Sequence, residues 1–100
     1  MPKIVERYIW KVKWGHANEF FELTKAEVER FGPGEDHGIY RILTPRFGPM
    51  STVVGEWVFD SEEQQQKAWA KWTAQPESRE WMENVDKLIE SATRELWTEH

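Results

Sequence analysis

The spacing of hydrophobic residues changes repeatedly along this 100-residue chain, and the order of the changes constrains the fold more than any other feature. Runs rich in β-branched and aromatic residues predict strands, and apolar residues recurring every three or four positions predict amphipathic helices. Glycine and proline separate most of these segments. The expected elements are a strand over residues 4–14, a helix over 16–31, strands over 38–47 and 52–59, a helical region over 61–89 that breaks before Pro76, and a strand over 92–98.

The order strand, helix, strand, strand, helix, strand is that of a ferredoxin-like α+β fold, βαββαβ. Gly48-Pro49 is expected to join the two middle strands as an antiparallel hairpin, and Ser61 with Gln64 has the spacing of a helix capping box. Residues 1–100 are expected to form a single domain, because their number suits one hydrophobic core and no repeat or linker interrupts them.

The composition argues against several classes of function. The formal net charge is −5, so the chain lacks the excess of Lys and Arg that binds nucleic acid or anionic membranes. The absence of cysteine rules out disulfides, thiolate catalysis and Cys-ligated metals. No apolar run is long enough to span a bilayer and the first residues do not resemble a signal peptide, so a cytoplasmic location is expected.

Seven tryptophans are more than one small core needs, so some are expected to line a second surface, either a subunit interface or a pocket. Three at helical spacing are assigned to the core between helices and sheet: Trp69, Trp72 and Trp81. The candidates for binding a flat apolar ligand are aromatic residues on strands: Tyr8, Trp10, Tyr40, Trp57 and Trp97. Packing in the core and in an interface is the alternative interpretation of these residues.

Charged side chains inside the predicted strands are the candidates for chemistry. Arg7 and Glu56 lie on the two strands expected at the centre of the sheet, and Arg94 is expected to share their face. Covered charges are paired or have shifted pKa values, so Glu56 is a candidate proton acceptor in a pocket. A structural ion pair at a subunit interface or on an exposed patch is the alternative.

The histidines do not support a metal site. His16 and Glu19 lie three residues apart on one face of the first helix, but no third ligand accompanies them, so no metal is expected. His37 follows two acidic residues near the start of a strand, where it is either a base at a pocket mouth or a solvated loop residue.

Three groups of residues carry a family resemblance. The first is Ile4-Val5-Glu6-Arg7-Tyr8, followed by Lys13-Trp14-Gly15 and Glu19-Phe20. The others are Gly48-Pro49-Met50 with Val53-Val54, Trp57 and Asp60, and then Trp72, Pro76, Glu77 and Trp81. In this order they resemble the NIPSNAP-like proteins of the dimeric α/β barrel superfamily, although Trp14 stands where that family usually has proline and Tyr8 where it often has arginine.

The resemblance implies a homodimer in which two ferredoxin-like protomers join sheet to sheet into an eight-stranded α/β barrel with the helices outside. The superfamily includes cofactor-independent monooxygenases, haem-degrading oxygenases, polyketide cyclases and dehalogenating enzymes, while many NIPSNAP-like members have no assigned activity. Haem-degrading relatives need a histidine on the second helical region, and this chain has none between Gln64 and Thr98. No cofactor is therefore expected.

The sequence leaves three hypotheses open. The first is a NIPSNAP-like protein that binds a small apolar or aromatic molecule between sheet and helices. The second is a cofactor-independent monooxygenase or polyketide-cyclase-like enzyme that moves protons with groups drawn from Tyr8, His37, Tyr40, Arg7 and Glu56. The third is a structural or partner-binding dimer without a pocket. Fold alone does not choose among them.

Overall fold

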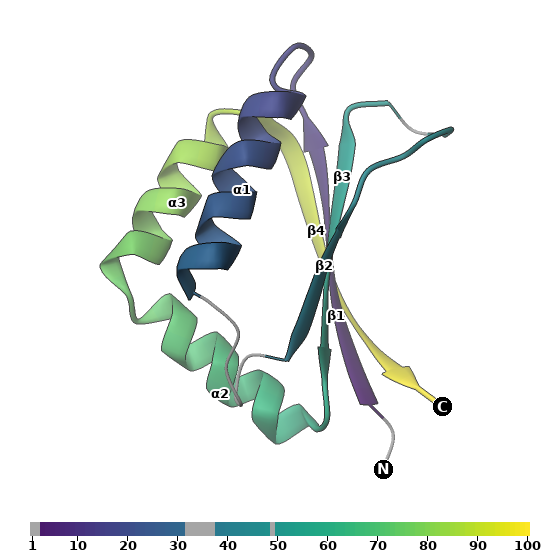
Figure 1. The fold of residues 1–100 in the computed structure, drawn as a ribbon, viewed down its shortest axis with the longest axis vertical. Coiled ribbons are helices and arrows are strands. Elements are labelled where there is room, and N and C mark those ends of the chain that lie inside the picture. The colour runs from purple at the N-terminus through teal and green to yellow at the C-terminus, as the bar shows by residue number, and fades with distance from the viewer. Residues whose placement is uncertain (1–2, 32–37, 49) are drawn as a thin grey trace.

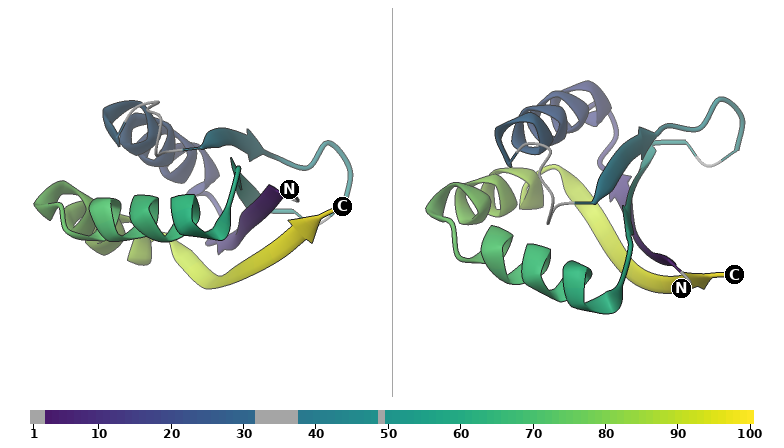
Figure 2. Two further views of the ribbon diagram at one scale, coloured as in Figure 1. Left: turned by 90° about the horizontal axis from the view of Figure 1, so that it is seen from below. Right: turned by 60° about the horizontal axis from the view of Figure 1, so that its bottom comes forward.

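The computed structural model describes residues 3–31, 38–48 and 50–100, and within them four strands form one sheet with three helices against one of its faces (Figure 1). The views in Figure 2 show that none of these helices covers the other face. The elements are β1 (Lys3–Val12), α1 (Ala17–Phe31), β2 (Ile39–Leu43), β3 (Thr52–Phe59), α2 (Glu62–Thr73), α3 (Pro76–Asp86) and β4 (Ile89–Glu99).

The strand order β2-β3-β1-β4 places β1 and β3 at the centre, and every neighbouring pair is antiparallel. This is the ferredoxin-like α+β fold that the order of elements predicted. Arg7 lies opposite Glu56 and Tyr8 lies opposite Gly55. Because successive side chains in a strand point to opposite faces, this register assigns each strand residue either to the helix face of the sheet or to its open face.

The strand boundaries differ most from those expected from sequence at β2 and at β4. β2 ends at Leu43, several residues before the expected end at 47, and β4 begins at Ile89, three residues before the expected start at 92. The reason at β4 is pairing with β1: the N–H of Lys13 donates to the carbonyl of Leu88 (2.7 Å). Leu88 and Ile89 have helical spacing in the sequence, but the chain enters the sheet there instead.

The expected break in the second helical region is present and its cause is local. The Oγ of Ser61 accepts from the N–H of Gln64 (3.1 Å), and the side chain of Gln64 accepts from the N–H of Asp60 (2.7 Å), which fixes the start of α2. Pro76 then opens α3, where its missing N–H costs no helical hydrogen bond. Two short helices can therefore follow the twisted sheet where one straight helix would not.

The core lies between the helix face of the sheet and the helices α1 and α3. Trp10 is buried at its centre, with its ring 5.2 Å from that of Phe20 and 6.3 Å from that of Trp81. Gly55 makes room for it, because a Cβ at that position would lie 2.9 Å from the Trp10 ring and from the Tyr40 hydroxyl oxygen. Toward α2 the packing is less complete, and a cavity remains there.

Candidate functional site

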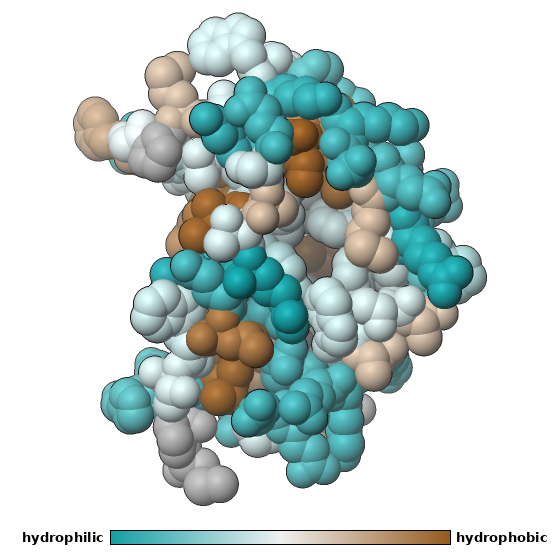
Figure 3. All heavy atoms as spheres, turned by 180° about the vertical axis from the view of Figure 1, so that it is seen from behind, coloured by the Kyte–Doolittle hydropathy of each residue, from teal (hydrophilic) through white to brown (hydrophobic). Residues whose placement is uncertain are grey.

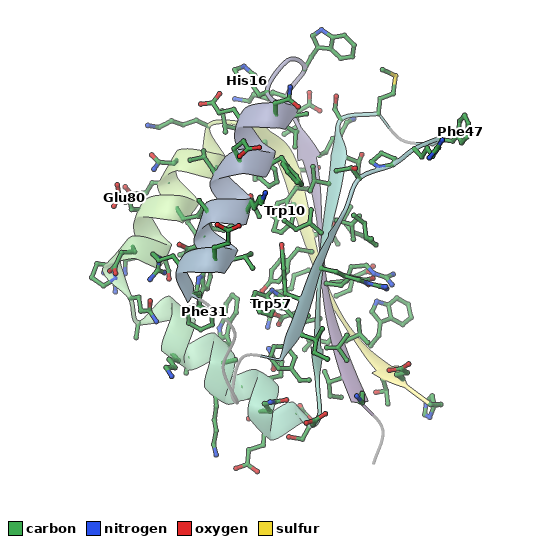
Figure 4. The ribbon with its side chains drawn as sticks, viewed as in Figure 1. Trp10, His16, Phe31, Phe47, Trp57 and Glu80 are labelled. Atoms are coloured by element: carbon green, nitrogen blue, oxygen red, sulfur yellow. The ribbon has the colours of Figure 1, made fainter. Side chains whose placement is uncertain are left out.

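The cavity lies between the helix face of the sheet and all three helices, encloses about 80 Å³ and is partly open to solvent. Figure 4 shows Phe31 on α1 and Trp57 on β3 on the two sides of the space between helix and sheet. The walls of the cavity are almost entirely apolar. The aromatic side chains that line it are Tyr8, Phe31, Tyr40, Trp57, Phe59, Trp69, Trp72 and Trp81.

Ring contacts make these walls continuous. On the sheet side the ring centroids of Tyr40 and Trp57 are 4.3 Å apart, and Phe31 meets Trp57 edge-on at 6.5 Å. On the helix side the centroids of Trp72 and Trp81 lie 5.7 Å apart, also edge-on. Such offset and edge-on contacts hold rings in definite positions, so the cavity has a definite shape.

One wall carries a buried carboxylate, that of Glu6, whose residue is only 3% exposed. Its oxygens accept hydrogen bonds from the hydroxyl of Tyr8 (3.0 Å), the side-chain amide of Gln65 (2.7 Å) and Nη2 of Arg94 (2.7 Å). Burial raises the pKa of the Tyr8 phenol above its usual range, and the charge and hydrogen bond of Glu6 raise it further. The phenol therefore stays protonated at neutral pH and acts as a donor.

A second carboxylate, that of Glu27 on α1, lines the cavity from the helix side. It accepts two hydrogen bonds from Arg30, from Nε at 2.7 Å and Nη2 at 2.9 Å, and one from the Nε1–H of Trp72 at 2.8 Å. Arg30 also reaches the hydroxyl of Ser78 on α3 (3.2 Å). Both carboxylates of the cavity thus have an arginine partner, and neither has an unbalanced charge.

Three residues that line the same cavity each carry a buried polar atom that has no hydrogen-bond partner among the described residues: Thr24 Oγ1, Tyr40 Oη and Trp81 Nε1. A buried polar group left unpaired costs about 1–3 kcal/mol, so three in one place are unusual. Burial raises the pKa of the Tyr40 phenol above its usual range, which keeps its proton in place.

The aromatic residues predicted to bind a ligand are only partly brought together. Tyr8, Tyr40 and Trp57 line the cavity, and Trp10 stacks on Tyr8 (5.4 Å between centroids) within the adjoining core. Trp97 lies opposite Val5 on the open face, so it does not share a surface with the other four. Its Nε1–H donates to Glu95 (3.1 Å).

The predicted catalytic candidates fall on different faces of the sheet. Tyr40 lines the cavity, whereas Arg7 and Glu56 are paired on the open face, where Nε of Arg7 donates to Glu56 Oε2 at 2.6 Å. His37 lies outside the described residues. The expectation that Arg94 shares the face of Arg7 is wrong, because Arg94 lies opposite Tyr8 and binds Glu6 on the helix face.

The Glu56 carboxylate is held by two arginines. Arg41 on β2 donates from Nε to its Oε1 at 2.6 Å, matching the bond from Arg7 on β1. Burial alone would raise the pKa of Glu56, but the hydrogen bonds from Arg41 and Arg7 outweigh it, and the pKa lies below its usual value. A carboxylate held in this way is a poor proton acceptor, which fits the ion-pair interpretation of Arg7 and Glu56.

Some of the site was not expected from sequence. Trp69, Trp72 and Trp81, which were assigned to the core, also line the cavity, and Trp81 packs against the core as well. The guanidinium of Arg94 lies 4.3 Å from the ring of Trp69. Glu6 was missed as well. The sequence does show that Glu6 shares a strand face with aromatic residues. That pattern alone does not distinguish a buried glutamate from an exposed one.

The part of the chain that the structure describes shows neither a metal site nor a membrane-spanning helix. It contains no cluster of three or more His, Cys, Asp or Glu side chains placed to hold a metal, and the contact between His16 and Glu19 (3.4 Å) is an exposed pair. No helix among the described residues has the length and apolar character needed to cross a membrane.

The strand order, with the helices on one face, defines a ferredoxin-like α+β protein. Residues 5–99 match the sequence model of the NIPSNAP family, so the chain belongs to that family. No curated protein matches it.

Solved structures share the fold. A NIPSNAP family protein from Agrobacterium tumefaciens is 20% identical with a TM-score of 0.81, covering 95% of this chain and 90% of its own. A NIPSNAP-like domain protein from Burkholderia xenovorans is 22% identical with a TM-score of 0.80, covering 94% and 82%. SnoaB, a cofactor-independent oxygenase from Streptomyces nogalater, is 18% identical with a TM-score of 0.75, covering 100% and 95%. At these identities the similarity concerns the fold.

We predict that Glu56→Gln lowers the free energy of unfolding by about 1–3 kcal/mol at pH 7, because it removes the charge that both arginines bind. The folded-state pKa of Glu56 lies below its ordinary value of 4.5, so its contribution is complete above that pH and is lost as the pH falls through the folded pKa. Urea denaturation from pH 7 to pH 3 should show the gap between the two proteins narrowing toward acid.

The matched control is Glu95→Gln. The carboxylate of Glu95 lies 4.0 Å from Nη1 of Arg7 but is one-third exposed, so its removal should cost less than about 1 kcal/mol. Equal costs for the two substitutions, or a Glu56→Gln cost that does not change with pH, would show that the buried pair does not stabilise the fold.

Proposed function

We propose that this NIPSNAP family protein binds a small, planar, apolar or aromatic molecule in the cavity between the sheet and the helices. The observation that supports the proposal is the cavity itself: a space with aromatic walls, three of whose lining residues carry an unpaired polar atom. Ligand sites typically combine a mostly apolar lining with a few polar groups that orient the ligand.

The volume limits the ligand. About 80 Å³ is below the roughly 300–1,000 Å³ of sites for drug-sized molecules, and below the roughly 150 Å³ of an engineered cavity that holds benzene. The enclosed space therefore suits one end of a small planar molecule, with the rest extending through the open mouth.

We also propose that the open face of the sheet is the surface through which two copies associate. Three apolar side chains are exposed there: Ile39 at 69%, Leu43 at 42% and Trp97 at 54%. Figure 3, which views the molecule toward the edge of the sheet rather than onto its open face, shows hydrophobic side chains exposed among hydrophilic ones on that side as well. Exposed apolar groups on a face that none of the three described helices covers favour association. An isologous pairing of the sheets would bury them together with the Arg7–Glu56–Arg41 cluster.

The second candidate function is a cofactor-independent oxygenase, as SnoaB is described. The observation that favours it is the pair formed by the Tyr8 hydroxyl and the Glu6 carboxylate inside the cavity, with Tyr40 nearby. We rank it second because Glu6 already binds Arg94 and Gln65, which leaves its carboxylate little capacity to take a proton from a substrate.

Filling the cavity should abolish ligand binding. Ala68 is buried and lines the cavity, so Ala68→Leu should place its larger side chain in the space and keep the fold. We expect saturation-transfer NMR to detect acetophenone bound to the unmodified protein and not to this variant.

Ala70→Leu is the matched control, because Ala70 lies on the same helix with an exposed side chain and should leave binding unchanged. Melting temperatures establish that each variant folds. If acetophenone and other small aromatic probes never bind the unmodified protein, or bind Ala68→Leu equally well, the proposed cavity function is wrong.

The dimer proposal predicts a particle of twice the chain mass of 12.0 kDa in light scattering at micromolar concentration. Trp97→Glu adds a carboxylate beside Glu95 on the open face and should shift the equilibrium toward monomer. Trp14→Glu, in the exposed turn after β1, should remain dimeric. A monomeric unmodified protein would refute the proposal.

A further inference from the structure

The unpaired polar atoms of the residues that line the cavity indicate which polar groups a ligand should carry, which the apolar walls do not. The Nε1–H of Trp81 is a donor and cannot accept a hydrogen bond. The hydroxyls of Tyr40 and Thr24 can donate as well as accept. A ligand that pairs all three at once must therefore present a hydrogen-bond acceptor.

The three atoms belong to one small space. All three residues line the same cavity, which encloses about 80 Å³. The Tyr40 hydroxyl oxygen and the Trp10 ring both lie 2.9 Å from the point where a Cβ of Gly55 would be. Trp81 packs against that same Trp10 ring, at 6.3 Å between centroids.

The charges of the cavity favour a neutral ligand. No Lys, Arg or His is among the described residues that line it, so an anionic ligand would find no cation there. The carboxylates of Glu6 and Glu27 are already bound by Arg94 and Arg30, so they give little net attraction to a cationic ligand. A cationic ligand would also offer no acceptor to the indole N–H of Trp81, which would then stay unpaired.

We propose that the ligand carries an uncharged oxygen acceptor, in the chemical class of a ketone, aldehyde or amide carbonyl on a planar apolar body. The carbonyl oxygen accepts hydrogen bonds from Tyr40 and Trp81, and the planar body lies against the aromatic walls of the cavity. This inference rests on the proposed ligand-binding function and specifies the ligand of that same cavity. Water is the competing occupant, because it can pair the same atoms.

The test compares two probes of nearly the same shape. Acetophenone has a carbonyl where α-methylstyrene has a C=CH₂ group, so only the acceptor differs. Both are titrated into ¹⁵N-labelled protein while the indole N–H signals are followed, with that of Trp81 assigned from Trp81→Phe. We expect acetophenone to bind several-fold more tightly and to move the Trp81 indole proton downfield. The Trp97 indole, already bonded to Glu95 on the open face, is the internal control and should not move.

Two variants locate the effect. Tyr40→Phe and Thr24→Val each remove an unpaired hydroxyl with little change of shape, so neither should lower the melting temperature of the free protein. Tyr40→Phe should weaken acetophenone roughly three- to tenfold and leave α-methylstyrene unchanged, as expected for one lost hydrogen bond. The comparison of the two probes on the unmodified protein stands even if a variant fails to fold.

The outcomes separate this inference from the proposed function. Equal affinity for both probes, with no shift of the Trp81 indole proton, would show that the ligand needs no hydrogen-bond acceptor. The proposed apolar binding site would be unaffected by that result. If benzoate or tetramethylammonium binds more tightly than acetophenone, the inference that the ligand is uncharged is wrong. If no probe binds and the cavity holds only water, the proposed function and this inference fail together.

Discussion

Each face of the sheet buries one glutamate, and the arginines that hold the two carboxylates connect all four strands. On the helix face Glu6 of β1 binds Arg94 of β4, and on the open face Glu56 of β3 binds Arg7 of β1 and Arg41 of β2. A buried carboxylate without its partners is strongly unfavourable. Sliding one strand by a single residue would move these groups to the wrong faces, so the pairs stabilise one register.

The same alternation along the strands produces two surfaces with different properties. On the helix face large rings pack around Trp10 and leave a cavity toward α2, where Glu6 is held away from solvent. On the open face the cluster of Glu56 and its arginines lies among exposed apolar side chains. We propose that the first surface binds the ligand and that the second joins two copies of the chain.

The sequence predicted the order of elements because hydrophobic spacing is a local property that survives in the fold. It also offered an ion pair between Arg7 and Glu56 as one of two interpretations, since both lie on central strands among aliphatic neighbours. It did not predict which face Arg94 and Trp97 occupy. No glycine or proline separates β4 from the preceding segment, so the start and parity of that strand depend on pairing with β1, which is a tertiary contact. Glu6 was missed for a related reason, because only its partners from β4 and α2 distinguish it from a solvated side chain.

The decisive measurement is a crystal structure of the protein grown with acetophenone. We expect the probe in the cavity between β3 and the helices, with its carbonyl oxygen within hydrogen-bond distance of Tyr40 Oη and Trp81 Nε1. A cavity that contains only ordered water bonded to these two atoms, with the probe absent or bound on the open face, would contradict it.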